Sequence, residues 1–319
     1  MTNMLVLNPL GFALAHYQKE LASILTNLQF QYNLSSEPEP SQSNSSRLRW
    51  VLVNFLNAYK YSKSSDDIIA LWPVLGYYDL LIYPMITGKK SITWIMHDPK
   101  PLTKAFGYGR IAKFIVAMLV NRNRIHIVVH SKESIAFIPS QLQEFVSVLP
   151  HPILTHSQNR VDRSPDQDRN IRVLGQFKHD RNIDILKEIS TFELDRNLIF
   201  EICGRNWPSI DGWRVDSRFL TEDTFTKLLR ATDLVLIPYI FFFQSGVAIR
   251  CLEERVPFMI SVNNFSKELL GEHDDFLLYG DIEFKIKSLL AKDASSVMDN
   301  MYEAYRTSTI TAWSDFFAG

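Results

Sequence analysis

Residues 244–246 read Gln-Ser-Gly, follow an apolar run and precede a segment with helical spacing. A helix that begins with small residues presents unpaired backbone N–H groups at the positive end of its dipole, and such an end binds anions. Here Ser245, Gly246 and Val247 would supply those amides, with Gln244 directly before them. We therefore expect a phosphate group to bind at the start of this helix.

A second group of polar residues points to the same chemistry. Gly175 ends another apolar run and is followed by Gln176, Lys178 and Arg181 before a helical pattern. Cations near the start of a helix are unfavourable for its dipole unless an anion binds between them. The pattern favours a phosphate held from two sides, and a solvated basic turn is the alternative.

Two titratable residues, His97 and Asp98, follow the apolar run 91–96 and precede Pro99-Lys100-Pro101. The prolines prevent the segment from continuing as regular structure, so both side chains project from the end of a strand. A histidine and a carboxylate in such a place can bond a substrate or move a proton. His151, between two prolines, would reach the same region or only shape the exit from the domain.

The elements that position these residues are short apolar runs that alternate with longer helical patterns. This alternation is typical of parallel sheets with crossover helices. The runs are residues 4–8, 67–72, 91–97, 125–131, 145–151, 171–175, 198–204, 233–239 and 257–261.

The polar stretch 153–170 cannot fill a core and divides the runs into two sets. The sequence therefore predicts an α/β protein with two doubly wound, Rossmann-like domains that face a cleft. The expected ranges are an acceptor-side domain at 1–152, a linker at 153–170, a nucleotide-binding domain at 171–293 and a helical segment at 294–319 that packs back on the first domain. A second polar stretch, 34–46, is expected to be a loop.

In open α/β sheets ligands bind beyond the carboxyl ends of the strands. Gly11 follows the first run in the sequence Asn-Pro-Leu-Gly, where a small residue would open a helix and let amides approach a ligand. An ordinary strand-to-helix turn is an equal alternative.

Composition limits the classes of partner and compartment. The chain has 319 residues with 34 basic and 35 acidic side chains, so no overall charge favours nucleic acid. Cys203 and Cys251 lack metal-ligand spacing and suit a reducing compartment. No signal peptide or membrane-spanning run is found. We expect a cytoplasmic protein without a metal or other cofactor.

Residues 107–124 join a short apolar run to Arg110, Lys113, Arg122 and Arg124. Such a segment can rest on an anionic membrane as a peripheral contact. The alternative is a helix buried on the first sheet.

In chain order the motifs are NPLG, WIMHDPKPL, VVHSKES, LPHPI, the segment from Gly175 to Arg181, RFLTED and ATDLVLIPY…QSG…VPFMIS. Their order over residues 4–285 resembles the GT-B-fold glycosyltransferases, close to the large retaining family four. The resemblance implies transfer of a sugar from a nucleoside-diphosphate donor to a hydroxyl of a glycan or lipid-linked glycan, without a metal.

The resemblance also implies roles for single residues. His97 would approach the transferred sugar, Arg181 stands where the family has a lysine on the diphosphate, and Gln176 where it often has arginine. The segment around Phe219 and Leu220 would flank the base. The remaining positions expected around the sugar, ribose and base are Gly204, Tyr239, Gln244, Glu253 and Glu254.

One departure weakens the mechanism that the resemblance implies. The family carries two glutamates eight residues apart where this chain has Phe242 and Arg250. An arginine only donates hydrogen bonds and cannot accept from ribose hydroxyls. Glu253 or Glu254 would substitute, unless Arg250 and Glu254 form a surface ion pair. A nucleotide-sugar epimerase of the same fold and a non-catalytic binding subunit are therefore alternatives.

Overall fold

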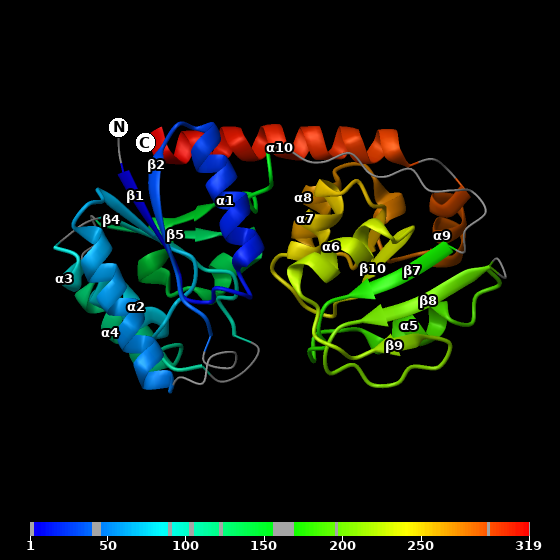
Figure 1. The fold of residues 1–319 in the computed structure, drawn as a ribbon, viewed down its shortest axis with the longest axis horizontal. Coiled ribbons are helices and arrows are strands. Elements are labelled where there is room, and N and C mark those ends of the chain that lie inside the picture. Colours follow the sequence, from blue (N-terminus) through cyan, green and yellow to red (C-terminus); the bar gives the residue numbers. More distant parts are fainter. Residues whose placement is uncertain are drawn as a thin grey trace. The chain divides into compact units, whose positions relative to one another are not determined.

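The chain forms two compact units in a computed structural model (Figure 1). The first consists of Met1–Thr155 with Thr309–Gly319, and the second of His156–Ser308. The structure describes residues 3–39, 46–88, 91–101, 105–120, 124–155, 169–194, 197–291 and 294–318. Most of the predicted linker, residues 156–168, lies outside these ranges.

The first unit is built on a six-stranded parallel sheet with the order β2-β1-β3-β4-β5-β6. The strands are β1 (Asn3–Asn8), β2 (Gln31–Ser36), β3 (Asp67–Ala70), β4 (Ser91–Ile95), β5 (Ile125–Val129) and β6 (Val146–Val148). All the predicted runs of this half are strands. The edge strand β2 was not predicted, because its sequence QYNLSS is mostly polar and exposed. The expected loop at 34–46 is wrong for its first three residues, which end β2.

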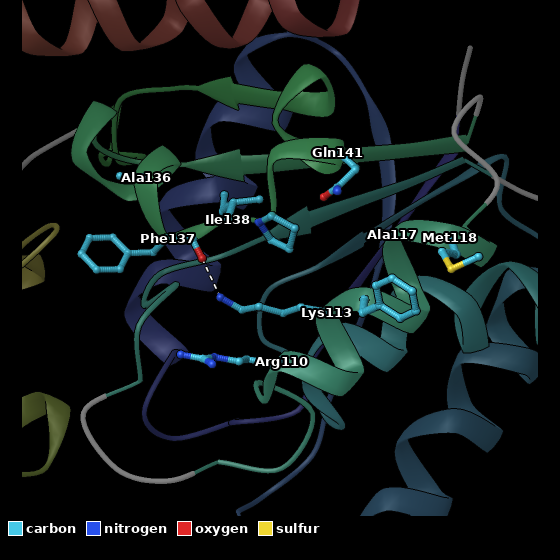
Figure 2. Close-up of a pocket in the computed structure, with 10 residues that line it drawn as sticks. Arg110, Lys113, Ala117, Met118, Ala136, Phe137, Ile138 and Gln141 are labelled. Atoms are coloured by element: carbon cyan, nitrogen blue, oxygen red, sulfur yellow. Dashed lines mark hydrogen bonds between the residues drawn. The ribbon is translucent and has the colours of Figure 1, made fainter.

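Helices cover both faces of this sheet. They are α1 (Ala15–Asn27), η1 (Gly76–Tyr78), α2 (Arg47–Ser62), α3 (Asp79–Ile86), α4 (Arg110–Leu119), η3 (Lys132–Phe137) and η4 (Ser140–Phe145). The 3-10 helix η3 is tied to α4, because the Lys113 ammonium donates a hydrogen bond of 2.7 Å to the carbonyl of Phe137 (Figure 2). Among the described residues no helix combines the length and apolar character needed to cross a bilayer.

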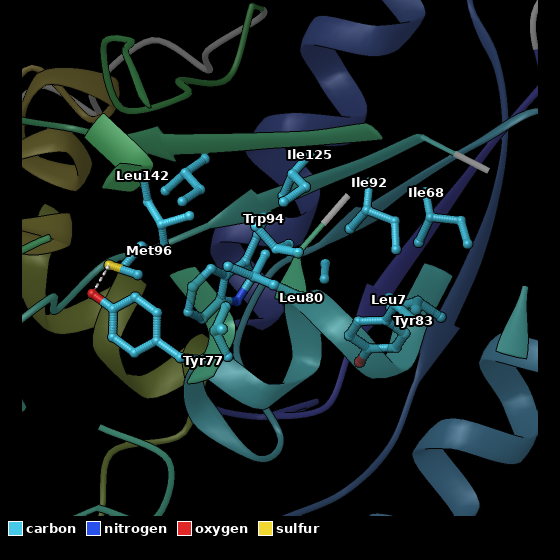
Figure 3. Packing of buried hydrophobic residues seen from close by; sticks show 14 of the residues in the cluster. Leu7, Ile68, Tyr77, Leu80, Tyr83, Ile92, Trp94, Met96, Ile125 and Leu142 are labelled. Atoms are coloured by element: carbon cyan, nitrogen blue, oxygen red, sulfur yellow. Dashed lines mark hydrogen bonds between the residues drawn. The ribbon is translucent and has the colours of Figure 1, made fainter. Parts of the chain in front are cut away.

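One face of the sheet carries a core shared by α2, α3, α4 and the 3-10 helices (Figure 3). Trp94 of β4 is fully buried at its centre and meets Tyr77 edge-on, with 5.5 Å between ring centres. Val116 of α4 and Leu80 of α3 reach the same cluster. These helices therefore bury one side each and turn the other side outward.

The opposite face of the sheet is covered by α1 and by the end of the long helix α10 (Ser295–Ala318). Leu21, Ile24 and Leu25 of α1 are fully buried there. Trp313 of α10 is equally buried, and its indole N–H donates a 3.0 Å hydrogen bond to the carbonyl of Pro150. The earlier residues of α10 belong to the second unit.

The second unit contains a five-stranded parallel sheet with the order β11-β10-β7-β8-β9. Its strands are β7 (Arg169–Leu174), β8 (Leu198–Cys203), β9 (Arg214–Asp216), β10 (Leu234–Ile237) and β11 (Phe258–Ile260). Its helices are α5 (Ile183–Ile189), α6 (Glu222–Arg230), α7 (Gly246–Glu253), α8 (Asn264–Leu270), η5 (Asp274–Phe276) and α9 (Ile282–Ala291). The predicted α/β class with two parallel-sheet domains is confirmed.

Candidate functional site

In the second unit the loops after β7 and β8 are pressed together. The Phe177 amide donates to the carbonyl of Arg205 at 2.8 Å, and the Trp207 indole donates to the carbonyl of Gly175 at 2.7 Å. Gly204 makes this contact possible: its φ is +149°, and an added Cβ would lie 2.1 Å from the Gly175 oxygen. A side chain at Gly204 would force the two loops apart.

Arg181 lies on the loop between β7 and α5 and is 7% exposed. Its backbone pairs with Tyr239, the second residue after β10, and its guanidinium carbon stacks 4.2 Å from the centre of the Tyr239 ring. The Trp207 ring centre is 6.0 Å away. The buried Nε of Arg181 has no hydrogen-bond partner among the described residues. The side chain is thus held by aromatic rings with part of its donor capacity unused.

The start of α7 leaves the same edge of the sheet, because β10 and β7 are parallel neighbours. Ser245 is the N-cap, is 2% exposed, and its hydroxyl accepts a 3.3 Å hydrogen bond from the amide of Ala248. Gly246 and Val247 are half-buried, and a Cβ added at Gly246 would meet nothing within 4 Å. The predicted start of this helix is confirmed, with open space above its first residue. Gln244, directly before the cap, is half-buried.

The other residues predicted around the donor are spread over neighbouring loops. Gln176 and Lys178 are exposed. Phe219 is 50% exposed, and the guanidinium of Arg205 stacks 4.7 Å from its ring centre. Leu220, beside it, is half-buried, and the following Thr221 caps α6 as its position predicts.

Arg250 of α7 binds α6. Its guanidinium donates to the Glu222 carboxylate at 2.8 Å and to the Thr226 hydroxyl at 2.6 Å. Glu254 pairs with Arg230 at 2.6 Å, so the ion pair expected as an alternative between Arg250 and Glu254 is wrong. The sequence did not reveal these partners, because they lie 24 to 28 residues away.

Neither position where the resembling family has glutamate provides an acceptor here. Phe242 is 8% exposed and packs 4.8 Å from the ring of Tyr239. Glu253 is 2% exposed, with its carboxylate 3.8 Å from Nε of Arg250. Glu253 is therefore the carboxylate that accompanies Arg250 on α7, while Glu254 belongs to the contact with Arg230.

In the first unit, three buried histidines gather at the carboxyl ends of neighbouring strands. His97 follows β4, His130 follows β5 and His151 follows β6, and each is 3–4% exposed. Tyr17 of α1 lies among them, with 4.5 Å between its ring centre and that of His97 and 4.9 Å to that of His151. Only His97 and His151 were singled out from sequence. The signal for His130 was its place directly after a strand.

The hydrogen bonds fix the tautomers of all three histidines, and His151 donates from Nδ1 to the Pro152 carbonyl at 2.7 Å. A carbonyl only accepts, so His97 donates from Nε2 to the Leu71 carbonyl at 3.1 Å. His130 donates from Nδ1 to the Leu149 carbonyl at 2.9 Å, and its Nε2 accepts the Tyr17 hydroxyl at 2.9 Å.

Burial keeps this cluster uncharged. It lowers the pKa of His97 to about 3, with the charge of His130 acting in the same direction and the Leu71 carbonyl opposing it. Burial also lowers the pKa of His130 to about 4 and holds the pKa of His151 well below its usual value. All three rings are neutral at pH 7 and act as hydrogen-bonding groups.

Two further predicted residues belong to the first unit. Asp98 is half-buried beside His97. Gly11 donates its amide to the Glu37 carbonyl at 2.8 Å, and an added Cβ would lie 2.8 Å from that oxygen. Helix α1 begins at Ala15, so the prediction that Gly11 opens it is wrong. Here the glycine allows two loops to approach each other.

No protein-family model and no curated protein matches this sequence. Solved structures match its fold. Anabaena HepE in complex with UDP and glucose is 11% identical with a TM-score of 0.63, over 100% of this chain and 98% of that chain. Sucrose-phosphate synthase from Thermosynechococcus elongatus is 10% identical with a TM-score of 0.64, over the same shares. The fold is GT-B. A UDP-forming trehalose-phosphate synthase from Burkholderia xenovorans shares this GT-B architecture at 10% identity and a TM-score of 0.63, over 100% of this chain and 98% of that chain.

Proposed function

We propose that this protein is a glycosyltransferase that transfers a sugar from a nucleoside diphosphate to a hydroxyl group. The observation that carries the proposal is Arg181, which is buried against aromatic rings at the sheet edge from which α7 starts. Its Nε has no hydrogen-bond partner within the described ranges. A buried cation with unused donors beside a helix N-terminus is suited to a diphosphate. The GT-B fold of proteins whose structures contain UDP, or UDP and glucose, supports this assignment.

The proposed reaction uses Arg181 and the α7 amides to stabilise a leaving group. The bond between the anomeric carbon and the donor phosphate breaks, and a bond forms between that carbon and the acceptor oxygen. The acceptor proton goes to the departing diphosphate. Arg181 and the amides of Ser245, Gly246 and Val247 neutralise its charge, so the proposal includes no metal ion.

The proposal also assigns catalytic roles to His97 and Asp98 of the first unit. A neutral His97, fixed in its tautomer by the Leu71 carbonyl, is a directed hydrogen-bonding group for a sugar or acceptor hydroxyl. We include transfer with retention, a glycan or lipid-linked glycan as acceptor, a role in polysaccharide biosynthesis and a cytoplasmic location.

Diphosphate binding tests the donor site. Calorimetry and thermal shift with UDP, GDP, ADP and dTDP are expected to show binding of one of them, with UDP tested first. Arg181→Met removes the charge and keeps the buried stem, and we expect about 10- to 100-fold weaker binding because a hydrogen bond to a charged group contributes about 1.5–3 kcal/mol. Arg306→Ala, on α10 with Glu303 as its partner, is the matched control and should bind normally.

Transfer to an acceptor tests the reaction. His97→Gln is expected to keep diphosphate binding and to lower donor-dependent transfer about 100-fold, the scale of one positioned acid–base or hydrogen-bonding group. His126→Asn, at an exposed position of β5, should leave transfer unchanged. Unchanged turnover in His97→Gln would remove this residue from the mechanism.

The non-catalytic binding subunit is supported by one observation. Arg250 stands at a glutamate position of the resembling family and is bound by Glu222 and Thr226 of α6. Binding of a diphosphate without turnover, across acceptors and partner chains, would favour this second function. Turnover without any acceptor would favour an epimerase.

A further inference from the structure

The outer sides of α2, α3 and α4 form an exposed apolar surface on the first unit, which we call the outer face. Eleven of the nineteen exposed large apolar side chains of the described residues lie on these helices or on the loop before α4. They are Leu48, Leu52, Leu56, Tyr59, Tyr61, Met85, Phe106, Ile111, Phe114, Met118 and Leu119. Exposed apolar groups that gather in this way mark a site of interaction, whereas single ones do not.

Helix α2 presents a regular stripe to this face. Leu48, Leu52, Leu56 and Tyr59 recur every three or four residues, and each is at least half exposed. The opposite side of α2 is in the core through Ala58, which is fully buried. Because one side already packs on the sheet, the exposed stripe is a second apolar side that the fold of this unit does not use.

Helix α4 presents a similar stripe. Ile111 is 74% exposed, Phe114 65% and Met118 68%, at a spacing of three and four residues. Helix α3 contacts both α2 and α4, and Figure 1 shows the three helices grouped on one side of this unit. On α3, Met85 is 80% exposed. The stripes of α2 and α4 are thus parts of one surface.

The charged side chains of α2, of α4 and of residues 99–109 before α4 are all cations. No acidic residue occurs from 46 to 65 or from 99 to 132. Exposed cations occupy the first turns of α2 and α4 at Arg47, Arg49 and Arg110, where no acidic residue balances them. Asp79 of α3 is 1% exposed and binds the amides of Val74 and Leu75. The face therefore complements a negatively charged partner.

A hollow of about 570 Å³ opens at the border of the outer face, where α4 meets η3 and η4. Phe114 and Met118 of the exposed stripe also line it. Figure 2 shows Arg110 and Lys113 extending from α4 in the direction of η3, where Lys113 reaches the Phe137 carbonyl. Apolar side chains are thus next to cations here, as an amphiphile with an anionic head requires.

We infer that the outer face docks on the anionic surface of a lipid bilayer. Separate stripes of Leu, Ile, Phe and Met with cations at the helix ends fit the boundary between acyl chains and phosphate groups, where amphipathic helices lie in the plane of the membrane. The cations then meet lipid phosphates, which also suits the positive first turns of α2 and α4. The inference goes beyond the proposed function, because it involves none of the donor residues.

Vesicle binding by the full-length protein tests the inference. Without nucleotide, the protein is expected to float with vesicles of phosphatidylcholine and phosphatidylglycerol at least tenfold more than with phosphatidylcholine alone. Binding should weaken between 0.05 and about 0.5 M NaCl, because salt shortens the Debye length from more than 10 Å to less than 5 Å. Arg47→Gln with Arg49→Gln should weaken it by more than tenfold, since each cation near an anionic surface contributes about fivefold.

Apolar variants separate the membrane from other partners. Phe114→Ser with Met118→Ser, and Leu52→Ser with Leu56→Ser, should each lose vesicle binding while circular dichroism stays unchanged. Phe284→Ser removes an equally exposed side chain, 65%, from α9 of the second unit and should bind vesicles normally. Equal binding to neutral and anionic vesicles would overturn the inference. Self-association in ultracentrifugation that both outer-face variants abolish would also overturn it and assign the face to a second copy.

Discussion

The carboxyl edges of the two sheets both bury polar side chains, which are neutral in the first unit and charged in the second. In the first unit, His97, His130 and His151 are buried and neutral, bonded to carbonyls and grouped around Tyr17. In the second unit, Arg181 is buried as a cation, because a guanidinium does not deprotonate in proteins. The same position in the fold therefore carries neutral hydrogen-bonding rings in one unit and a buried cation in the other.

This difference shows how each edge responds to its surroundings. A buried neutral histidine cluster lowers stability once the pH falls into the range in which the unfolded histidines protonate. An arginine keeps its charge at any working pH, and a charged group with unused donors can bind an anionic ligand. Acidity should affect the first unit more, and a ligand should affect the second.

The largest expected effect is acid destabilisation of the first unit. The folded pKa values of His97, about 3, and His130, about 4, lie below the unfolded value of about 6.5, so the unfolded chain binds more protons between these limits. Stability is unaffected above about pH 6.5 and falls below it, by roughly 1 kcal/mol per pH unit for each histidine. Urea unfolding at a series of pH values from 7.5 to 5 measures the slope of the free energy of unfolding against pH.

A single replacement sharpens this test. His130→Gln keeps an amide donor for the Leu149 carbonyl and removes one titrating group, so the slope should fall by roughly 1 kcal/mol per pH unit. His126→Asn, at an exposed position, should leave the slope as it is. A wild-type stability that is flat from pH 7.5 to 5 would show that these rings do not form a neutral buried cluster.

The next effect concerns the contact between the loops after β7 and β8. Gly204→Ala would place a methyl group 2.1 Å from the Gly175 oxygen at φ +149°, and we expect a loss of about 3 kcal/mol or more from clash and backbone strain. Gly246→Ala, with nothing within 4 Å and no positive φ, should change stability by less than about 1 kcal/mol. Equal urea midpoints for the two variants would contradict this close approach.

A smaller effect is expected when the hydrogen bond between Tyr17 and His130 is removed from the histidine cluster. Its hydroxyl donates to Nε2 of buried His130, so Tyr17→Phe leaves an acceptor unsatisfied and should lower the free energy of unfolding by about 1–2 kcal/mol. Tyr32→Phe removes a hydroxyl that bonds Thr26 at an exposed position and should lower it by less than about 0.5 kcal/mol. Equal losses in the two variants would mean that the hydrogen bond from Tyr17 to His130 stabilises the fold no more than an exposed one does.

Most of the fold follows from sequence because parallel strands buried on both faces leave continuous apolar runs. The run at 233–239 contains β10, and the small residues at 245–246 mark the start of α7. Strands β2 and β9 were not predicted: one is polar and the other has three residues. Both are edge strands without an apolar run, unlike the edge strands β6 and β11, which the runs 145–151 and 257–261 predict.

The candidate site was predictable where polar residues follow a strand or precede a helix. His97 was found because it follows an apolar run directly, and Arg181 because it is a cation near the start of a helical pattern; the burial of both was not predicted. The partners of Arg250 and the contact of Tyr17 with His130 depend on packing between elements far apart in the chain. A single sequence carries no periodic signal for such pairs.

The smallest expected effect is the change in the free energy of unfolding when Arg181 is replaced. Arg172 serves for comparison, because both arginines belong to the second unit and are 7% exposed. Arg172 is bonded to Glu201 at 2.7 Å and to the hydroxyl of Thr232 at 3.1 Å, whereas Nε of Arg181 has no partner in the described part of the chain. Arg181→Met removes an incompletely bonded buried charge, whose desolvation costs about 1–3 kcal/mol, and loses a cation–π contact that contributes about 0.5–1 kcal/mol.

Without ligand, Arg181→Met should therefore leave the free energy of unfolding unchanged or raise it by about 1 kcal/mol. Arg172→Met is the opposing control and should lower it by about 3 kcal/mol, because it leaves Glu201 without its partner. Denaturant unfolding of both variants in the absence of nucleotide measures the difference. A loss above about 1 kcal/mol in Arg181→Met would mean that this side chain supports the fold. A gain in stability joined to lost diphosphate binding would identify it as a residue held in place for a ligand, since such sites are retained at the expense of stability.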